Sequence, residues 1–142
     1  MIVYFDTSAL VKVYVEESDS RQMRIMAENA EDVATSVVTY AEMRAAFARK
    51  HRFGSINESI LSAVKRDFNL AWPGLRRLAA DDATLRRAGD LAEIHNLRGF
   101  DAIHLASAEM LQRAAGTVTF ACFDAQLVRA ATSCGLAPLP LD

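Results

Sequence analysis

The chain contains few cysteines and few prolines. Its two cysteines, Cys122 and Cys134, do not form a CxxC pair and are too few for a disulfide framework. Cys122 lies in an apolar run, so we expect it to be a small buried hydrophobic residue. The three prolines are Pro73, Pro138 and Pro140, and so few helix breakers predict a mainly helical protein.

The chain also lacks a long uncharged segment. No apolar run approaches the ~20 residues that a membrane-spanning helix requires. No basic region precedes the first apolar stretch, and Asp6 interrupts that stretch early, so the N-terminus does not resemble a secretion signal. We therefore expect a cytoplasmic protein that makes no membrane contact.

A basic excess is absent as well, because the formal net charge is -2. Such a total does not by itself indicate a nucleic-acid-binding protein. Acidic residues gathered around a bound cation would, however, leave the remaining surface closer to balance. The 142 residues are 51% apolar and 24% charged, which predicts one globular domain covering residues 1–142.

Short apolar segments alternate with helical patterns along the chain. We predict strands at residues 2–5, 33–36, 117–123 and 136–137, and helices at 7–15, 19–30, 38–52, 57–72, 82–96, 101–115 and 125–134. This alternation is typical of an α/β fold in which helices cover both faces of a parallel sheet. The helix at 101–115 contains few charged residues for its length, so we expect it to be deeply buried. In the helix at 82–96, Arg86 and Arg87 are expected to face water.

Two aspartates stand where predicted strands end. Asp6 follows the first apolar strand, and Asp124 follows the strand at 117–123. The carboxyl ends of parallel strands meet at one edge of the sheet, where ligands bind in α/β proteins. Asp6 and Asp124 are therefore expected to lie side by side. The alternative interpretation is that each aspartate only caps the helix that follows it.

Two further acids lie on apolar helical faces. The neighbours of Glu42 on its helix face are small or apolar residues: Val38, Thr39, Ala45 and Ala46. Glu42 should therefore point inward, either into an acidic site or towards an internal arginine. Asp101 opens the helix at 101–115 and lies either in the same site or at an N-cap.

A cluster of these four acids would need a cation, because neighbouring carboxylates repel one another and raise one another's pKa. Ligand sets made only of oxygen atoms suit hard cations such as Mg²⁺ and Mn²⁺. Such an ion activates a bound water and stabilises charge on phosphoryl oxygens, as phosphodiester hydrolysis requires. No serine or cysteine with a paired base is evident, so we expect water to be the nucleophile.

These acids fall in four motifs that resemble a known family. The motifs are YFDTSALVK at residues 4–12, SVVTYAE at 36–42, LRGFDAIHLASA at 97–108 and TFACFDAQL at 119–127. Their order and spacing across the whole chain are similar to those of the PIN domain, specifically of the VapC-type toxins of bacterial or archaeal toxin–antitoxin pairs. The resemblance implies a PIN-like α/β/α sandwich whose short, mainly parallel central sheet is flanked by helices.

The resemblance also implies roles for individual residues. Asp6 and Asp101 would be the principal metal ligands, and Glu42 and Asp124 would complete the acidic pocket directly or through water. Further residues of the motifs would be accessory: Thr7, Ser8, Ser36 and Arg98. Some relatives carry one more acid where this chain has Gln126, which favours one tightly bound metal over two.

The activity implied by the resemblance is that of an endoribonuclease dependent on Mg²⁺, with Mn²⁺ as a substitute. Such proteins are the toxin components of type II toxin–antitoxin systems. The implied partners are an RNA substrate, a cognate VapB-like antitoxin and a second copy of the chain in a homodimer.

Other interpretations remain open at this point. A non-catalytic PIN-like RNA-binding module would share the fold, although such modules usually lose some of the acids. An aspartate-dependent phosphatase would carry a second aspartate where this chain has Ser8. Related DNA-directed nucleases are normally longer than this chain. His104 is either a general base or a histidine whose hydrogen bonds are satisfied inside the core.

Overall fold

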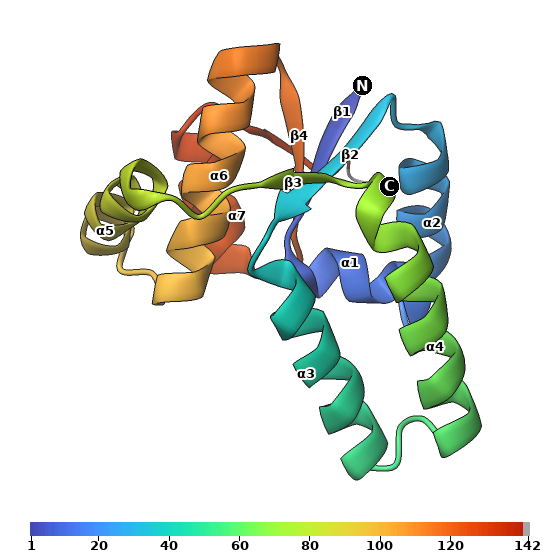
Figure 1. Ribbon diagram of the computed structural model, residues 1–142. Coiled ribbons are helices and arrows are strands. Elements are labelled where there is room, and N and C mark those ends of the chain that lie inside the picture. The colour runs from blue at the N-terminus through green and yellow to red at the C-terminus, as the bar shows by residue number, and fades with distance from the viewer. Residues whose placement is uncertain (141–142) are drawn as a thin grey trace.

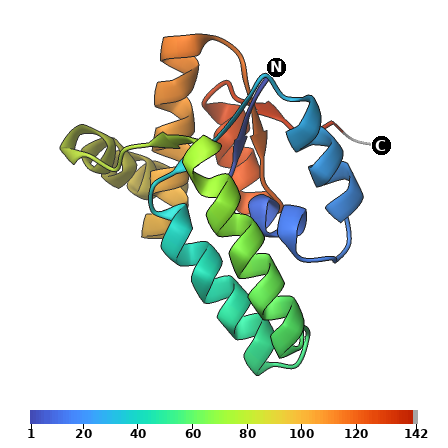
Figure 2. The same cartoon turned by 45° about the vertical axis from the view of Figure 1, so that its right-hand side comes forward.

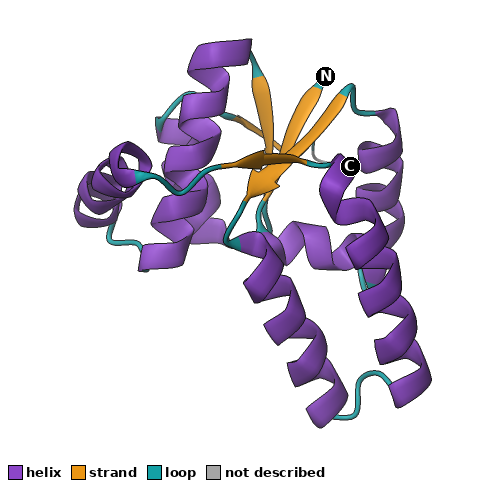
Figure 3. Cartoon of the chain, viewed as in Figure 1, coloured by secondary structure: helices purple, strands orange, loops and turns teal. Residues whose placement is uncertain are grey.

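The structure is a computed structural model that describes residues 1–140. Its centre is a sheet in which β1 is flanked by β2 and β4, in the order β3-β2-β1-β4-β5 (Figure 3). Every pair of neighbouring strands is parallel. The strands are β1 (Ile2–Phe5), β2 (Asp32–Ser36), β3 (Arg76–Leu78), β4 (Val118–Ala121) and β5 (Ala137–Pro138). The predicted α/β fold with a parallel sheet is therefore confirmed.

Helices connect the strands and cover the sheet on both sides (Figure 1). They are α1 (Thr7–Tyr14), α2 (Ser20–Asn29), α3 (Thr39–Arg52), α4 (Glu58–Ala71), α5 (Asp82–His95), α6 (Gly99–Ala115) and α7 (Ala125–Ser133), with a 3-10 turn at Trp72–Gly74. None of the helices within residues 1–140 combines the length and the apolar character that crossing a membrane would need. Helices α3 and α4 form an antiparallel hairpin that extends away from the sheet (Figure 2).

The side chains of β1 alternate between two hydrophobic cores, as the pleat of a strand requires. Val3 and Phe5 pack into a core shared with helices α1 to α4. Tyr4 points to the other face and packs with Phe120 of β4 in a core shared with α5, α6 and α7. The molecule is thus a three-layered sandwich around one central sheet.

Helix α6 and Cys122 confirm two predictions about burial. Buried positions along α6 include Leu105, Ala106 and Ala108, although the helix begins at Gly99, two residues earlier than predicted. Cys122 is 4% exposed, and burial raises the pKa of its thiol well above the usual range. The thiol is therefore protonated and structural at neutral pH.

Strand β3 was not predicted from the sequence. It contains only three residues, and Arg76 and Arg77 are exposed at the edge of the sheet. Neither the apolar alternation nor the β-branched composition that marks a strand is present there. Backbone pairing with β2 and an ion pair from Arg76 to Asp32 hold the strand in place instead.

Arg87 faces water only in part, because its side chain is 35% exposed and also reaches α6. Its Nε and Nη2 atoms donate to the two carboxylate oxygens of Glu109 on α6, at 2.8 and 2.9 Å. The Glu109 side chain is only 8% exposed, so this two-pronged contact neutralises a buried charge. Arg86, in contrast, is 80% exposed as predicted and pairs only with the exposed Asp82.

We predict that Arg87→Ala destabilises the protein far more than Arg86→Ala. Loss of Arg87 leaves the Glu109 carboxylate with only the longer contact to Arg113, which should cost about 1–3 kcal/mol. An exposed ion pair within one helix contributes about 0.3–0.5 kcal/mol, so Arg86→Ala should have little effect. Urea unfolding of both variants measures the difference, and equal losses would contradict this account of the α5–α6 contact.

Candidate active site

The four predicted acids line one cavity of about 610 Å³. It lies beyond the carboxyl ends of β1 and β4, with α3 and the start of α6 forming its other sides. Asp6, Glu42, Asp101 and Asp124 all reach it, and so do three of the accessory residues: Thr7, Ser8 and Arg98. Ser36 is not part of its lining, because the Ser36 hydroxyl is buried and accepts the backbone N–H of Val38 at 3.2 Å.

Asp6 and Asp124 are brought together by the pairing of β1 with β4. Phe5 and Ala121 are partners in this parallel ladder, and the N–H of Asp6 continues the ladder by donating to the Ala121 carbonyl at 3.1 Å. Each carboxylate also caps the next helix, Asp6 accepting from Ala9 N–H and Asp124 from Leu127 N–H, both at 3.0 Å. Each aspartate therefore caps the helix that follows it, and both also line the cavity.

Ser8 joins the loops that carry these two aspartates. Its hydroxyl donates to Oδ1 of Asp6 at 2.7 Å and accepts the backbone N–H of Phe123 at 3.1 Å. The segment before Asp124 is thereby tied to the first turn of α1. Ser8 therefore orients an acid of the cavity and is not the helix cap.

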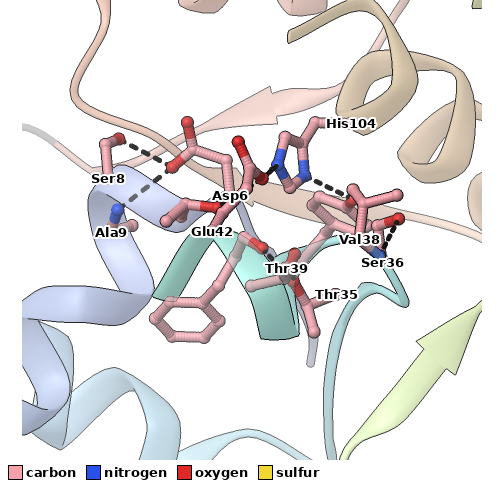
Figure 4. A network of polar contacts seen from close by, with 12 residues as sticks. Asp6, Ser8, Ala9, Thr35, Ser36, Val38, Thr39, Glu42 and His104 are labelled. Carbon is pink, nitrogen blue, oxygen red and sulfur yellow. Dashed lines mark hydrogen bonds and ion pairs between the residues drawn. The ribbon is translucent and has the colours of Figure 1, made fainter. Parts of the chain in front are cut away.

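Glu42 reaches the same cavity from α3. Its Oε1 atom accepts a hydrogen bond from the Thr7 hydroxyl at 2.7 Å and lies 2.7 Å from Nε2 of His104. Figure 4 shows Asp6, Glu42 and His104 close together. The internal partner of Glu42 is thus a histidine, not the arginine that the alternative interpretation required.

Asp101 lies in the first turn of α6, three residues before His104. It is not the N-cap of the helix, because Arg98 occupies that position. Its Oδ2 atom lies 3.9 Å from Nε of Arg98, whose side chain is 88% exposed. Asp101 is therefore half-buried and faces the cavity, while Arg98 stands at the rim.

The carboxylates differ in how easily they hold negative charge. Burial raises the pKa of Asp6, which is only 4% exposed. Burial also raises the pKa of Asp101, and the nearby charge of Asp124 raises it further against the opposing effect of Arg98. Burial acts on Glu42 too, but the hydrogen bond and attraction of His104 outweigh it and lower its pKa. The side of the cavity that carries Asp6, Asp101 and Asp124 therefore has an excess of negative charge, whereas Glu42 is paired with His104.

A hard divalent cation fits this side of the cavity by donor chemistry and by charge. Mg²⁺ binds proteins through one or two carboxylates and keeps several waters. Asp6 and Asp101 supply such a pair, with Asp124 close enough to affect the charge of Asp101. In the described part of the chain, however, no three His, Cys, Asp or Glu side chains lie close enough to hold a metal together. The acidic side chains within the described residues are therefore farther apart than in the crowded cluster expected from the sequence.

Sequence reasoning considered His104 but missed its contact with Glu42, and it missed Phe100 altogether. His104 is buried with its hydrogen bonds satisfied, as one interpretation held, but it also lines the cavity and contacts Glu42. Its spacing of three residues from Asp101 on one helix places both on the same face and was the available signal. Phe100, 57% exposed at the rim, had no signal beyond its position before Asp101.

We predict that Asp6→Asn stabilises the metal-free protein at neutral pH. The folded-state pKa of Asp6 is raised, so the carboxylate loses stability as the pH rises from its unfolded pKa near 4 to the folded value, whereas asparagine stays neutral and still caps α1. The gain should be complete above the folded pKa and absent below the unfolded one. Each kcal/mol recovered raises Tm by about 4 °C, measurable by thermal melts in EDTA. Glu93→Gln, at an exposed site on α5, is the control, and a lower Tm for Asp6→Asn would contradict the electrostatic account.

Comparison with known proteins agrees with this geometry. The family model of the PIN domain matches residues 3–132. The chain is 35% identical over 143 aligned positions to Ribonuclease VapC45 and to Ribonuclease VapC49, each from a strain of Mycobacterium tuberculosis, covering 99% of this chain and 98% of each relative.

A solved structure shares the fold at lower identity. The crystal structure of FitAcB from Neisseria gonorrhoeae superposes with a TM-score of 0.67 at 21% identity, covering 99% of this chain and 97% of the other. The resemblance expected from the four motifs is thereby confirmed. The chain belongs to the PIN domain family and, within it, to the VapC-type group.

Proposed function

We propose that this protein is a metal-dependent endoribonuclease and the toxin of a VapBC-like type II toxin–antitoxin system. The observation that carries the proposal is the convergence of Asp6, Glu42, Asp101 and Asp124 on one cavity. Relatives at 35% identity over nearly their whole length are named ribonucleases, which supports RNA as the substrate. A location in the cytoplasm, where RNA is available, follows from this proposal.

Asp6 and Asp101 would hold Mg²⁺ directly, and Glu42 and Asp124 would act directly or through water. When bound, the ion lowers the pKa of a coordinated water and stabilises charge on the phosphoryl oxygens. Mn²⁺ would substitute, since it takes the same oxygen ligands. The Gln126 side chain supports a single metal, because its Nε2 donates to the Asn96 carbonyl at 2.8 Å.

Other residues of the cavity orient the acids or would bind the RNA. The hydrogen bonds from Ser8 and Ala9 to the Asp6 side chain both end on Oδ1 and hold the carboxylate in place. Thr7 holds Glu42 in the structure, so its contribution runs through that acid. Arg98 stands at the rim with its guanidinium in solvent, where it would bind an RNA phosphate close to the acids.

Membership of the VapC-type group supports protein partners for the toxin. A cognate VapB-like antitoxin and a second copy of the chain in a homodimer are the partners that we propose. Phe53 on the α3–α4 hairpin is 78% exposed and Ile94 on α5 is 67% exposed, so these side chains are accessible to a partner.

We predict that Asp101→Asn abolishes metal-dependent cleavage of cellular RNA. The change removes a proposed ligand and the negative charge that attracts the ion, while the shape of the side chain is kept. Loss of groups that merely orient metal ligands costs about 10–100-fold, so the loss here should exceed 100-fold. The assay uses purified protein free of antitoxin, with Mg²⁺ or Mn²⁺ and then with EDTA.

Glu93→Gln is the matched control for this assay, because Glu93 is an exposed acid outside the cavity lining. It should cleave like the wild type. RNA retention without cleavage, unaffected by EDTA or by Asp101→Asn, would overturn the proposal in favour of a non-catalytic PIN-like RNA-binding module.

Arg98→Ala should weaken RNA binding and reduce its dependence on salt. Removal of one phosphate contact from a single-stranded complex lowers the slope of log K against log salt by about 0.7. Binding is measured in an inactive Asp6→Asn background, so that the RNA stays intact. Arg86→Ala, which removes an exposed arginine outside the cavity, should leave the slope unchanged. If both variants have the same slope, Arg98 does not bind an RNA phosphate.

A further inference from the structure

A buried chain of polar contacts leads from the centre of the sheet to Glu42. The Tyr4 hydroxyl lies 2.8 Å from Nδ1 of His104. The other ring nitrogen of His104, Nε2, lies 2.7 Å from Oε1 of Glu42, and Figure 4 shows His104 beside Glu42. Tyr4 is fully buried and His104 is 1% exposed. These contacts connect β1, α6 and α3, which lie far apart in the sequence.

The direction of the contact with Glu42 follows from hydrogen-bond chemistry. The Oε1 atom of Glu42 already accepts the Thr7 hydroxyl at 2.7 Å, and a carboxylate oxygen in this role only accepts hydrogen bonds. The Nε2 atom of His104 therefore donates. Since this nitrogen donates to Glu42 and Nδ1 lies against the Tyr4 hydroxyl, both ring nitrogens are already engaged in hydrogen bonds inside the protein. The general-base interpretation of His104 is not supported by this arrangement.

Tyr4 is held firmly enough to fix the imidazole. Its ring stacks on Phe120 with centroids 5.6 Å apart and planes inclined by 7°, and it meets the His104 ring edge-on at 5.9 Å. A phenol keeps its hydrogen at neutral pH, so the Tyr4 hydroxyl can donate as well as accept. A hydroxyl that both donates and accepts matches either hydrogen arrangement of Nδ1.

Both contacts to Glu42 use the same oxygen. Thr7 Oγ1 and His104 Nε2 each lie 2.7 Å from Oε1, and within residues 1–140 neither contact involves Oε2. The second oxygen of Glu42 and that of Asp6 point to the same side in Figure 4. Glu42 has a long side chain on a helix that extends away from the sheet, so its direction depends on these two anchors.

We propose that Tyr4 and His104 are a positioning pair that holds Glu42 by one oxygen and turns the other towards the metal-binding side of the cavity. The relevance of this pair to RNA cleavage rests on the proposed function. Its effect on the position of Glu42 does not. Groups that orient metal ligands in this way usually affect metal affinity and activity by about 10–100-fold.

The test uses Tyr4→Phe and His104→Gln in the full-length protein, with two readouts. Mn²⁺ affinity is measured by the electron paramagnetic resonance of free Mn²⁺, and RNA cleavage gives kcat and KM. Tyr4→Phe removes only the hydroxyl and should raise the Kd for Mn²⁺ and lower kcat by about 10-fold, with KM little changed. His104→Gln keeps a hydrogen-bond donor for Glu42, so it should lose less Mn²⁺ affinity and less kcat than His104→Ala.

Leu111→Ala separates positioning from simple destabilisation. Leu111 is buried near the far end of α6, so the variant loses stability without touching Glu42. Below its Tm it should bind Mn²⁺ like the wild type. If Leu111→Ala weakens Mn²⁺ binding as much as Tyr4→Phe does, the pair has only a structural role.

A double-mutant cycle decides whether Tyr4 acts through Glu42. In a Glu42→Gln background, Tyr4→Phe should cause no further loss of Mn²⁺ affinity, whereas additive losses would overturn the proposal. Unchanged Mn²⁺ affinity and kcat in Tyr4→Phe and His104→Gln would overturn it as well. If the wild type binds Mn²⁺ but cleaves no RNA, the ribonuclease proposal fails and the cycle still tests the positioning pair. If the wild type binds no Mn²⁺, both proposals fail.

Discussion

The parallel pairing of β1 with β4 is the constraint on which the site depends. It places the ends of the two strands next to each other, and each end is followed at once by an aspartate that caps a helix. The Asp6 carboxylate is buried as a result, and burial raises its pKa. Folding thus places a poorly solvated negative charge at a fixed point, where a cation gains more than it would in water.

The remaining parts of the cavity come from helices that pack on opposite faces of the sheet. Helix α3 belongs to the core that contains Phe5, whereas α6 belongs to the core that contains Tyr4. Glu42 and Asp101 therefore approach Asp6 from two sides. The contact between Glu42 and His104 bridges these two layers at the edge of the sheet. The packing of both cores consequently contributes to the geometry of one cavity.

Much of this arrangement could be predicted from residue patterns. Apolar runs that end in aspartate identified β1 and β4, and the small number of charges along the predicted helix at 101–115 indicated the burial of α6. Strand β3 could not be predicted, because its backbone pairing is imposed by the neighbouring β2 and leaves no apolar pattern in Arg76 and Arg77. The Arg87–Glu109 contact was missed for a similar reason, since it depends on how α5 packs against α6. The partner of Glu42 likewise depended on tertiary packing.

The central claim is that Asp6 and Asp101 together bind one divalent cation. The most direct measurement is anomalous diffraction from crystals of the protein soaked in Mn²⁺. The account predicts one strong anomalous peak between these two carboxylates, with Asp124 and Glu42 in contact directly or through water. A saturating soak that shows Mn²⁺ only elsewhere on the protein, or an anomalous map without a peak in this cavity, would contradict it.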